Sequence, residues 1–444
     1  MDKKSLITGF NQWRSKYVKD RTFLIIASII IGMVAGLVAV VLKVSTHYIH
    51  TQVQILASSE KFHFLFILFP LTGIFLTVLF IQKIRKGKIG RGIANIIHSI
   101  SKRSGSIPAD NMYSHAVSSA VTVGFGGSVG LEAPIVVTGS AIGSNIAGLL
   151  LMPRKEKIIL LASGAAAGIA AIFNTPIAGV LFAMEVLLAE LSIPSFIPIL
   201  IASASGAVVS QALFKGHIIF PLTQNWNMQA LPFYILLGIM CGLLSVYFMR
   251  MYFLTEKKFS ASTNHYKKAI VGGVLLAACI FLFPPLYGEG YVSISDLVQG
   301  NEILLLQNSL LENFTTNEYV LVFFIVAIVL IKVFATSITI GAGGNGGVFA
   351  PSLFTGALSG YAYATLMNMT GSANLVKENF IAAGMAGMLS GLVHAPLTAI
   401  FLIAEITGGY TLFIPLMIVS AISYFISKSL EPYSIYTGKL AQKG

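Results

Sequence analysis

Hydrophobic residues form long runs along the chain, and the lengths of these runs follow the same order twice. Residues 22–45 and 62–82 are each long enough to cross the hydrocarbon core of a bilayer, which takes a helix of about 20 apolar residues. From residue 92 to residue 213 the apolar segments are shorter and are broken by Gly or Pro. The second half begins again with two long runs, 231–254 and 268–286, and broken segments follow later. This pattern predicts an all-α polytopic membrane protein made of two repeats.

The repeated order of the runs divides the chain into five parts. We expect a cytoplasmic amphipathic segment at 1–21, a first transmembrane repeat at 22–213, a connecting loop at 214–230, a second repeat at 231–430 and a short cytoplasmic C-terminal helix at 431–444. Several broken segments are too short to cross a membrane alone, because a helix rises only about 1.5 Å per residue. The ends of these segments must therefore lie within protein or beside a water-filled path.

The composition agrees with a location in the bilayer. Of the 444 residues, 55% are hydrophobic and 10% are charged, whereas soluble domains carry about 25% charged residues. The net charge of +12 comes from basic clusters between apolar runs, for example Lys83, Arg85 and Lys86. Such clusters mark the cytoplasmic side of a membrane protein and do not indicate nucleic-acid binding. We expect a multi-pass protein of a bacterial inner or plasma membrane, with both termini in the cytoplasm and with no cofactor or metal.

Two glycine-rich motifs recur at a nearly constant offset. Residues 124–134, GFGGSVGLEAP, align with residues 341–351, GAGGNGGVFAP, at an offset of 217 residues, and a second pair around Pro176 and Pro396 aligns at 220. Gly permits tight turns and Pro suits the first turn of a helix, so each motif predicts a loop that leads into a helix start. Close helix packing in lipid explains scattered glycines but not this repetition. We therefore expect a transport site at the repeat interface.

Such helix starts suit an anion, because their free backbone N–H groups carry partial positive charge. Glu132 follows the first motif, and a carboxylate at membrane depth is a functional candidate. This carboxylate can occupy the anion site itself or swing away and leave the site to a solute anion. The alternative is a structural carboxylate that caps a helix. Val348 and Phe349 of the second motif would present backbone N–H groups from the paired helix start.

Hydroxyl groups offer further anion contacts. Residues 104–108, SGSIP, could hold a partly dehydrated anion through a hydroxyl and backbone N–H groups, or they could form an ordinary turn. Tyr433 and Tyr436 could each donate a hydroxyl, or they could anchor the chain at the membrane interface.

Three more ionisable residues lie in apolar segments. Glu185 and Glu405 occupy equivalent positions of the two repeats, and this symmetry favours structural hydrogen bonding over a part in a proton path. His394 is a lone histidine, which is more often a hydrogen-bonded core residue than a proton relay.

Taken together, four motifs resemble the CLC family of chloride channels and chloride/proton exchangers, in the bacterial form without cytoplasmic CBS domains. The matching stretches are SGSIP at 104–108 (family GSGIP), GLEAP at 130–134 (family G(K/R)EGP), GGVFAP at 346–351 (family G(I/V)FAP), and FNTPIAGVLFAMEV at 173–186 with its counterpart APLTAIFLIAEI at 395–406. The likeness covers roughly residues 20–440. It implies a homodimer in which each subunit has its own anion pore, built from two inverted-topology repeats of tilted, partly broken helices.

The resemblance also implies roles for individual residues. Glu132 falls on the external gating glutamate, and chloride is the implied ligand. The implied anion contacts are Gly105, Ser106, Ile107, Val348, Phe349 and Tyr433. Gly105 stands where the family has its central serine, so the preference for chloride over nitrate stays open, and fluoride transport is a minor alternative within the family. Leu131 replaces the basic residue that usually precedes the gate, which removes a positive charge there.

One position bears on proton coupling. Val186 stands where proton-coupled exchangers commonly carry a second glutamate, directly after the residue that matches Glu185. Because valine cannot pass a proton, the sequence favours channel-like chloride conduction gated by Glu132, with proton-coupled chloride exchange as the alternative. Some exchangers lack this glutamate, so both readings stay open. A membrane-embedded enzyme is a third class, for which no familiar catalytic motif is present.

Overall fold

The computed structural model describes residues 16–57, 68–87, 89–90, 92–188, 193–216, 220, 225–312 and 318–441. Most of the predicted amphipathic segment at 1–21, and part of the predicted loop at 214–230, lie outside the described residues. Within them, the secondary structure is helical, with one isolated β-bridge. The α-helices are α2 (Asp20–Ala57), α3 (Phe69–Leu79), α4 (Gly92–Lys102), α5 (Asn111–Gly124), α6 (Glu132–Leu149), α7 (Arg154–Phe173), α8 (Pro176–Phe182), α9 (Ile193–Leu213), α10 (Leu231–Ser260), α11 (His265–Leu282), α12 (Tyr291–Val298), α13 (Glu318–Gly341), α14 (Phe349–Met369), α15 (Lys377–Val393), α16 (Pro396–Ile406), α17 (Phe413–Leu430) and α18 (Gly438–Ala441). The π-helical turns are η2 (Phe80–Ile84) and η3 (Ala183–Leu187), and the 3₁₀ turns are η4 (Met228–Ala230), η5 (Pro284–Leu286) and η6 (Glu302–Leu306).

Seven helices of the described chain are long and apolar enough to cross a membrane. They are, or lie within, α2, α7, α9, α10 with η4, α11, α13 and α17. Large apolar side chains such as Leu37 and Val41 on α2 and Phe323 on α13 are exposed on their surfaces, as lipid contact requires. The prediction of an all-α, multi-pass membrane protein is therefore confirmed.

The chain forms two compact units that interleave along the sequence. The first comprises Met1–Leu42, Ile89–Ala116 and Pro134–His217, and the second comprises Lys43–Lys88, Val117–Ala133 and Ile218–Gly444. Both glycine-rich loops consequently belong to the second unit, although they come from different halves of the sequence. The compact units thus do not coincide with the repeats predicted at 22–213 and 231–430.

In the first unit, α6 and α7 approach so closely that only glycine fits at their contact. A Cβ atom on Gly139 would lie 2.1 Å from the carbonyl oxygen of Gly164, and a Cβ atom on Gly164 would lie 2.0 Å from that of Gly139. One turn along α6, a Cβ atom on Gly143 would lie 2.0 Å from the oxygen of Leu160. Small residues of this kind let helices pack backbone to backbone in a membrane protein.

In the second unit, α14 and α15 repeat the same contact. A Cβ atom on Gly356 would lie 2.3 Å from the oxygen of Gly384, and one on Gly360 would lie 2.0 Å from the oxygen of Phe380. These residues stand at the two offsets that the sequence motifs gave, so each repeat contains the same helix pair.

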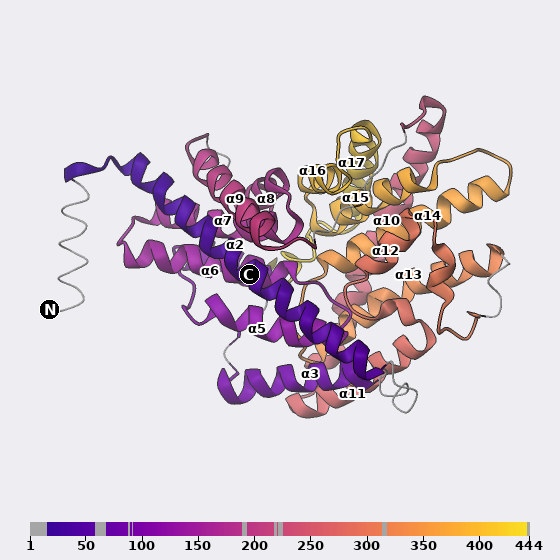
Figure 1. Ribbon diagram of the computed structural model, residues 1–444, viewed down its shortest axis with the longest axis horizontal. Coiled ribbons are helices and arrows are strands. Elements are labelled where there is room, and N and C mark those ends of the chain that lie inside the picture. Colours follow the sequence, from indigo (N-terminus) through magenta and orange to yellow (C-terminus); the bar gives the residue numbers. More distant parts are fainter. Residues whose placement is uncertain are drawn as a thin grey trace. The chain divides into compact units, whose positions relative to one another are not determined.

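The helix ends that follow these pairs also match. Asn174 ends α7 with φ 59° and ψ 39°, and His394 ends α15 with φ 60° and ψ 41°, both in the left-handed region. In each repeat the next helix, α8 or α16, then begins at a proline, Pro176 or Pro396. Within the second unit, Figure 1 shows α16 and α17 beside α15, and α3 beside α11.

Candidate functional site

The two glycine-rich loops pair with each other in the second unit. The Gly130 N–H donates to the Gly347 oxygen at 2.9 Å, and the Gly347 N–H donates to the Gly130 oxygen at 2.8 Å. This is an antiparallel bridge between two residues that the repeat relates by an offset of 217. Equivalent residues that pair antiparallel lie about a local two-fold axis, which is what inverted repeats require.

The turns that lead into the bridge are also alike. Gly126 has φ 89° and Gly343 has φ 107°, values that favour glycine over other residues. The next residue of each loop then closes the same turn: the Gly127 N–H donates to the Thr122 oxygen at 2.8 Å, and the Gly344 N–H donates to the Thr339 oxygen at 2.9 Å. The glycines of the two motifs are therefore needed for the shape of both loops.

Glu132 is the first residue of α6, and its side chain folds back over the loop. The residue is 1% exposed, and its Oε1 atom accepts a hydrogen bond of 2.6 Å from the Tyr291 hydroxyl. A Cβ atom on Gly130 would lie 2.0 Å from Oε2 of Glu132, so the carboxylate occupies the space that a side chain would take. Among the described residues, Oε2 has no hydrogen-bond partner, which is unusual for a buried oxygen.

The start of α14 lies next to this carboxylate. The same Cβ atom on Gly130 would lie 2.7 Å from Cβ of Ala350, the second residue of α14. Val348 and Phe349 are buried, and Val348, the N-cap residue of α14, makes no side-chain capping hydrogen bond. Its first N–H groups have no partners within the helix, so the carboxylate faces a region of positive potential.

The two C-terminal tyrosines differ in burial. Tyr433, the predicted anion contact, is 57% exposed, whereas Tyr436 is 7% exposed. The Tyr436 hydroxyl has no hydrogen-bond partner among the described residues, and the charge of Glu132 acts on it. Of the two hydroxyls that the sequence offered, that of Tyr436 is therefore the buried one, and it is the one that feels the charge of Glu132.

The segment Gly105–Ile107 belongs to the first unit and is held by Ser144. Gly105 adopts φ 73°, its oxygen accepts a hydrogen bond of 2.6 Å from Ser144 Oγ, and the Ile107 N–H donates to the same Oγ at 3.0 Å. The Ser106 N–H donates to the Arg103 oxygen at 3.0 Å. Ser106 is exposed and lines a pocket together with Arg103. The backbone N–H groups are thus engaged within the chain, and the Ser106 hydroxyl is the group that can meet an anion.

The two symmetric glutamates lie in different kinds of helix. Glu185 and Val186 fall in η3, the π-helical turn that continues α8, whereas Glu405 is the second-last residue of the regular helix α16. Both glutamates are half-buried. The backbone around the two glutamates therefore differs, although their sequence positions are equivalent. Single π-turns are frequent at functional sites.

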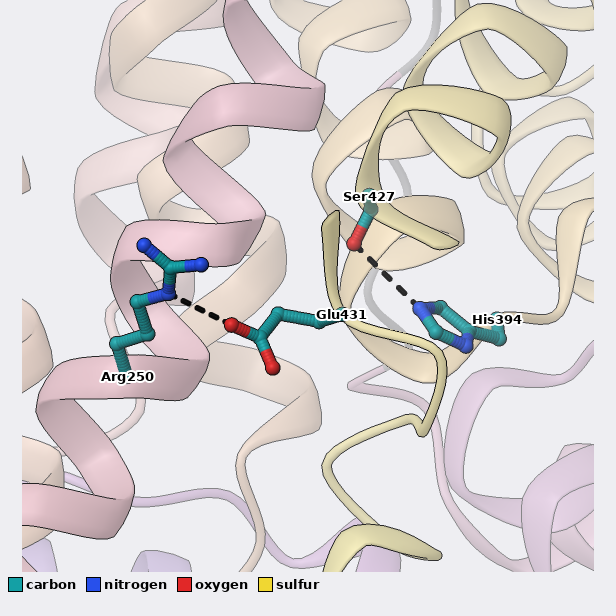
Figure 2. Close-up of polar contacts among 4 residues, drawn as sticks. All are labelled: Arg250, His394, Ser427 and Glu431. Atoms are coloured by element: carbon teal, nitrogen blue, oxygen red, sulfur yellow. Dashed lines mark hydrogen bonds and ion pairs between the residues drawn. The ribbon is translucent and has the colours of Figure 1, made fainter. Parts of the chain in front are cut away.

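His394 contacts two side chains of α17 in the second unit. Its Nε2 atom lies 3.4 Å from Ser427 Oγ, and its ring packs edge-on against Tyr424 with 5.8 Å between centroids. Figure 2 shows the contact of His394 with Ser427, together with the ion pair of Arg250 and Glu431, whose Nε and Oε1 atoms lie 2.6 Å apart. These contacts agree with a hydrogen-bonded core histidine.

Sequence reasoning missed three residues in the surroundings of Glu132. Tyr291 contacts Glu132 directly, and Glu289 accepts a hydrogen bond of 3.2 Å from the N–H of Leu131. Lys332 is fully buried in α13, where its Nζ atom donates to the Gly288 oxygen at 3.1 Å. A lone lysine within the apolar run 318–338 was the available signal for this cluster.

Comparison with known proteins identifies the fold family. A sequence model of the family described as "Voltage gated chloride channel" matches residues 73–428, which is most of the chain. The chain belongs to this voltage-gated chloride channel family. The resemblance inferred from the four motifs is thereby confirmed. Two of those motifs, GLEAP and GGVFAP, form the paired loops around Glu132 that are described above.

Several curated proteins resemble this family member. The "H(+)/Cl(-) exchange transporter ClcA" of Vibrio campbellii is 29% identical over 326 residues, which cover 71% of the chain and 66% of the Vibrio protein, so the match spans just under two thirds of that relative. The "Putative chloride channel protein ClcB-like" of Ralstonia nicotianae is 26% identical and is covered over 85% of both chains. The "Chloride channel protein CLC-f" of Arabidopsis thaliana is 30% identical over 68% of the chain and 39% of the relative.

Solved structures share the fold of this family member. A slow cyanobacterial Cl⁻/H⁺ antiporter superposes with a TM-score of 0.79 at 24% identity, over 96% of this chain and 98% of the other. A CLC-type fluoride/proton antiporter gives a TM-score of 0.77 at 24% identity, over 94% and 97%. At these identities the comparison establishes the architecture alone.

Proposed function

We propose that this protein transports chloride across a membrane and that the carboxylate of Glu132 closes the anion path. One observation carries this proposal: a buried carboxylate at the first residue of α6 lies against the start of α14, whose N-cap residue supplies no side-chain cap. Positive potential at helix starts attracts a negative group, and here the protein supplies its own. When Glu132 accepts a proton it loses its charge, and a solute anion can then replace it.

Tyr436 completes this site in our proposal. Its buried hydroxyl is free to donate a hydrogen bond, whereas Tyr433 lies on the surface. We therefore assign the hydroxyl contact to Tyr436 and the backbone contacts to Val348 and Phe349. The Ser106 hydroxyl of the first unit is proposed as a separate anion contact, on the basis of its exposed position beside Arg103.

We further propose that chloride transport is coupled to protons. The relatives from Vibrio are named H(+)/Cl(-) exchange transporters, and one structural neighbour is described as a Cl⁻/H⁺ antiporter. These likenesses outweigh the sequence preference for a channel. Channel-like conduction is the second candidate, favoured by Val186, which leaves no second carboxyl group directly after Glu185.

Purified protein in lipid vesicles separates the two candidates. Under an inward chloride gradient, an exchanger drives protons out of the vesicle against their own gradient, whereas a channel does not. We expect uphill proton movement, measured with a pH dye inside the vesicles, and we expect it to be absent in Glu132→Gln. Chloride flux without uphill proton movement in the unmodified protein would establish the channel. Competition of fluoride or nitrate with chloride in the same vesicles tests the other substrates, of which fluoride is favoured by the description of a second neighbour.

Removing the Tyr291 hydroxyl should make the gate easier to open. The hydroxyl donates to Glu132 at 2.6 Å and stabilises the charged carboxylate, and a hydrogen bond to a charged group contributes about 1.5–3 kcal/mol. In Tyr291→Phe, Glu132 should therefore accept a proton at higher pH, and the midpoint of flux against pH should rise by about one to two units. Tyr319→Phe, which removes an exposed hydroxyl, is the control. A midpoint that falls, or that matches the control, would contradict this role of Tyr291.

A further inference from the structure

A second carboxyl group lies beside the gate, in the turn that precedes α12. Glu289 sits between Gly288 and Gly290, whose φ values of 67° and 94° form a tight turn that returns the chain toward the gate loop. Its Oε1 atom accepts the N–H of Leu131, the residue directly before Glu132. Two residues later, Tyr291 donates to Glu132 itself. The segment 289–291 therefore contacts both the backbone and the carboxylate of the gate.

Two ammonium groups act on this second carboxyl. Lys332 is fully buried, bonds to the oxygen of Gly288 and lies 4.7 Å above the ring of Phe354. Lys43 on α2 is half-buried and also attracts Glu289. A buried ammonium without a nearby negative charge is costly, so Glu289 balances these lysines. Among the described residues, the hydroxyls of Tyr291 and Tyr436 also feel the charge of Glu132. His50 lies beside Tyr287, two residues before Glu289, with 5.5 Å between their rings.

The two carboxyl groups influence each other. Glu289 lies in the segment between the candidate spans α11 and α13, where burial raises the pKa of its carboxyl above the ordinary value. The negative charge of Glu132 adds to this increase, whereas the Leu131 N–H, Lys332 and Lys43 oppose it. Two nearby carboxyl groups in such a setting resist carrying two negative charges, and their titration belongs to the pair.

We propose that Glu289 is a positioning residue for the gate: it holds the N–H of Leu131 next to Glu132, and its negative charge, balanced by Lys332 and Lys43, sets the pH at which Glu132 releases the anion path. This inference rests on the proposed function of Glu132. Glu132 is 1% exposed whereas Glu289 is half-buried, so Glu289 also lies closer to solvent. Changes of charge in this cluster should therefore move the pH profile of transport even though Glu289 lies outside the anion site.

The variant Glu289→Gln tests the proposal, because the amide oxygen can still accept the Leu131 N–H while the charge is gone. Without this neighbouring charge, Glu132 can stay ionised to lower pH. The midpoint of chloride flux against pH should fall by about one unit, and the profile should narrow to that of a single proton. Glu312→Gln is the matched control, since Glu312 is an exposed carboxylate of the same inter-span segment. A Glu289→Gln profile that coincides with the control profile would overturn the proposal.

A second variant keeps the test valid if Glu289→Gln does not fold. Lys43→Met removes a positive charge from the cluster and should move the midpoint to higher pH, opposite to Glu289→Gln. An unchanged midpoint in the folded Lys43→Met protein would overturn the proposal.

Measurements on Glu132→Gln distinguish failure of the proposed function from failure of the inference about Glu289. If Glu132→Gln alone retains the pH profile of the unmodified protein, the proposed function fails. If Glu132→Gln abolishes the profile but Glu289→Gln leaves it unmoved, only the present inference fails. The double variant should transport like Glu132→Gln alone, because no gate carboxylate is left for Glu289 to influence.

Discussion

Replacing Glu132 by Gln is expected to leave chloride flux in place and to abolish its dependence on pH. The neutral amide resembles the protonated carboxyl, which in our account no longer holds the positive potential at the starts of α6 and α14. If protonation opens the path, flux through the unmodified protein falls by about tenfold for each pH unit above the midpoint. The variant should show no such fall.

Chloride efflux from vesicles over a range of pH values measures this effect. Glu378→Gln is a suitable control, because Glu378 is an acidic residue in the first turn of another helix, α15, outside the gate. Loss of all flux in a folded Glu132→Gln protein, or a pH profile like that of the control, would count against the gate assignment.

The second large effect concerns folding. Gly143→Ala should destabilise the protein severely, because its Cβ atom would lie 2.0 Å from the backbone oxygen of Leu160 and neither helix backbone can yield locally. Overpacking that forces backbone shifts costs about 1–3 kcal/mol and occasionally more, and this contact is among the tightest. We expect loss of the folded protein from detergent extracts, measured by size-exclusion chromatography and thermal unfolding.

Gly148→Ala is the matched control on the same helix. Gly148 is exposed, and a Cβ atom there would come no closer than 3.9 Å to another group, Nζ of Lys157. Gly148 is the second-last residue of α6, so alanine there should leave the stability close to that of the unmodified protein. Equal yields and melting temperatures for Gly143→Ala and Gly148→Ala would show that α6 and α7 do not pack as described.

The loops could be predicted because glycine and proline report backbone geometry directly. The offset of 217 residues identified Gly130 and Gly347 as equivalent, and the structure joins them in a single antiparallel bridge. Likewise, the second motif placed Pro176 and Pro396 at the starts of two helices, where they are found. In both cases the residue type, glycine or proline, indicates the backbone conformation that the position requires.

Contacts between distant side chains could not be predicted in this way. Tyr291 lies 159 residues after Glu132 in the sequence, and Glu289 lies close to Tyr291. Neither residue stands in a sequence motif. Lys332 was visible only as a cation in an apolar run, with no sign of its partner at Gly288. The choice between Tyr433 and Tyr436 similarly depends on burial, which a short polar tail does not reveal.

Some expectations stay predictions. These are the homodimer, the cytoplasmic location of both termini, the bacterial membrane, and the proton path through Glu185 and Glu405. The π-turn at Glu185 makes this residue the better candidate of the two for a part in proton movement, since Glu405 lies in a regular helix.

Direct localisation of an anion in Glu132→Gln is the measurement that bears most closely on the gate. Crystals grown in bromide would show by anomalous scattering where a halide binds. If the carboxylate of Glu132 closes the path, we expect a bromide peak in Glu132→Gln at the place that the carboxylate occupies here, between Gly130, Ala350 and the Tyr291 hydroxyl. We expect no such peak in the unmodified protein at neutral pH. The same set of bromide peaks in both proteins, with none at this place, would contradict closure of the path by Glu132.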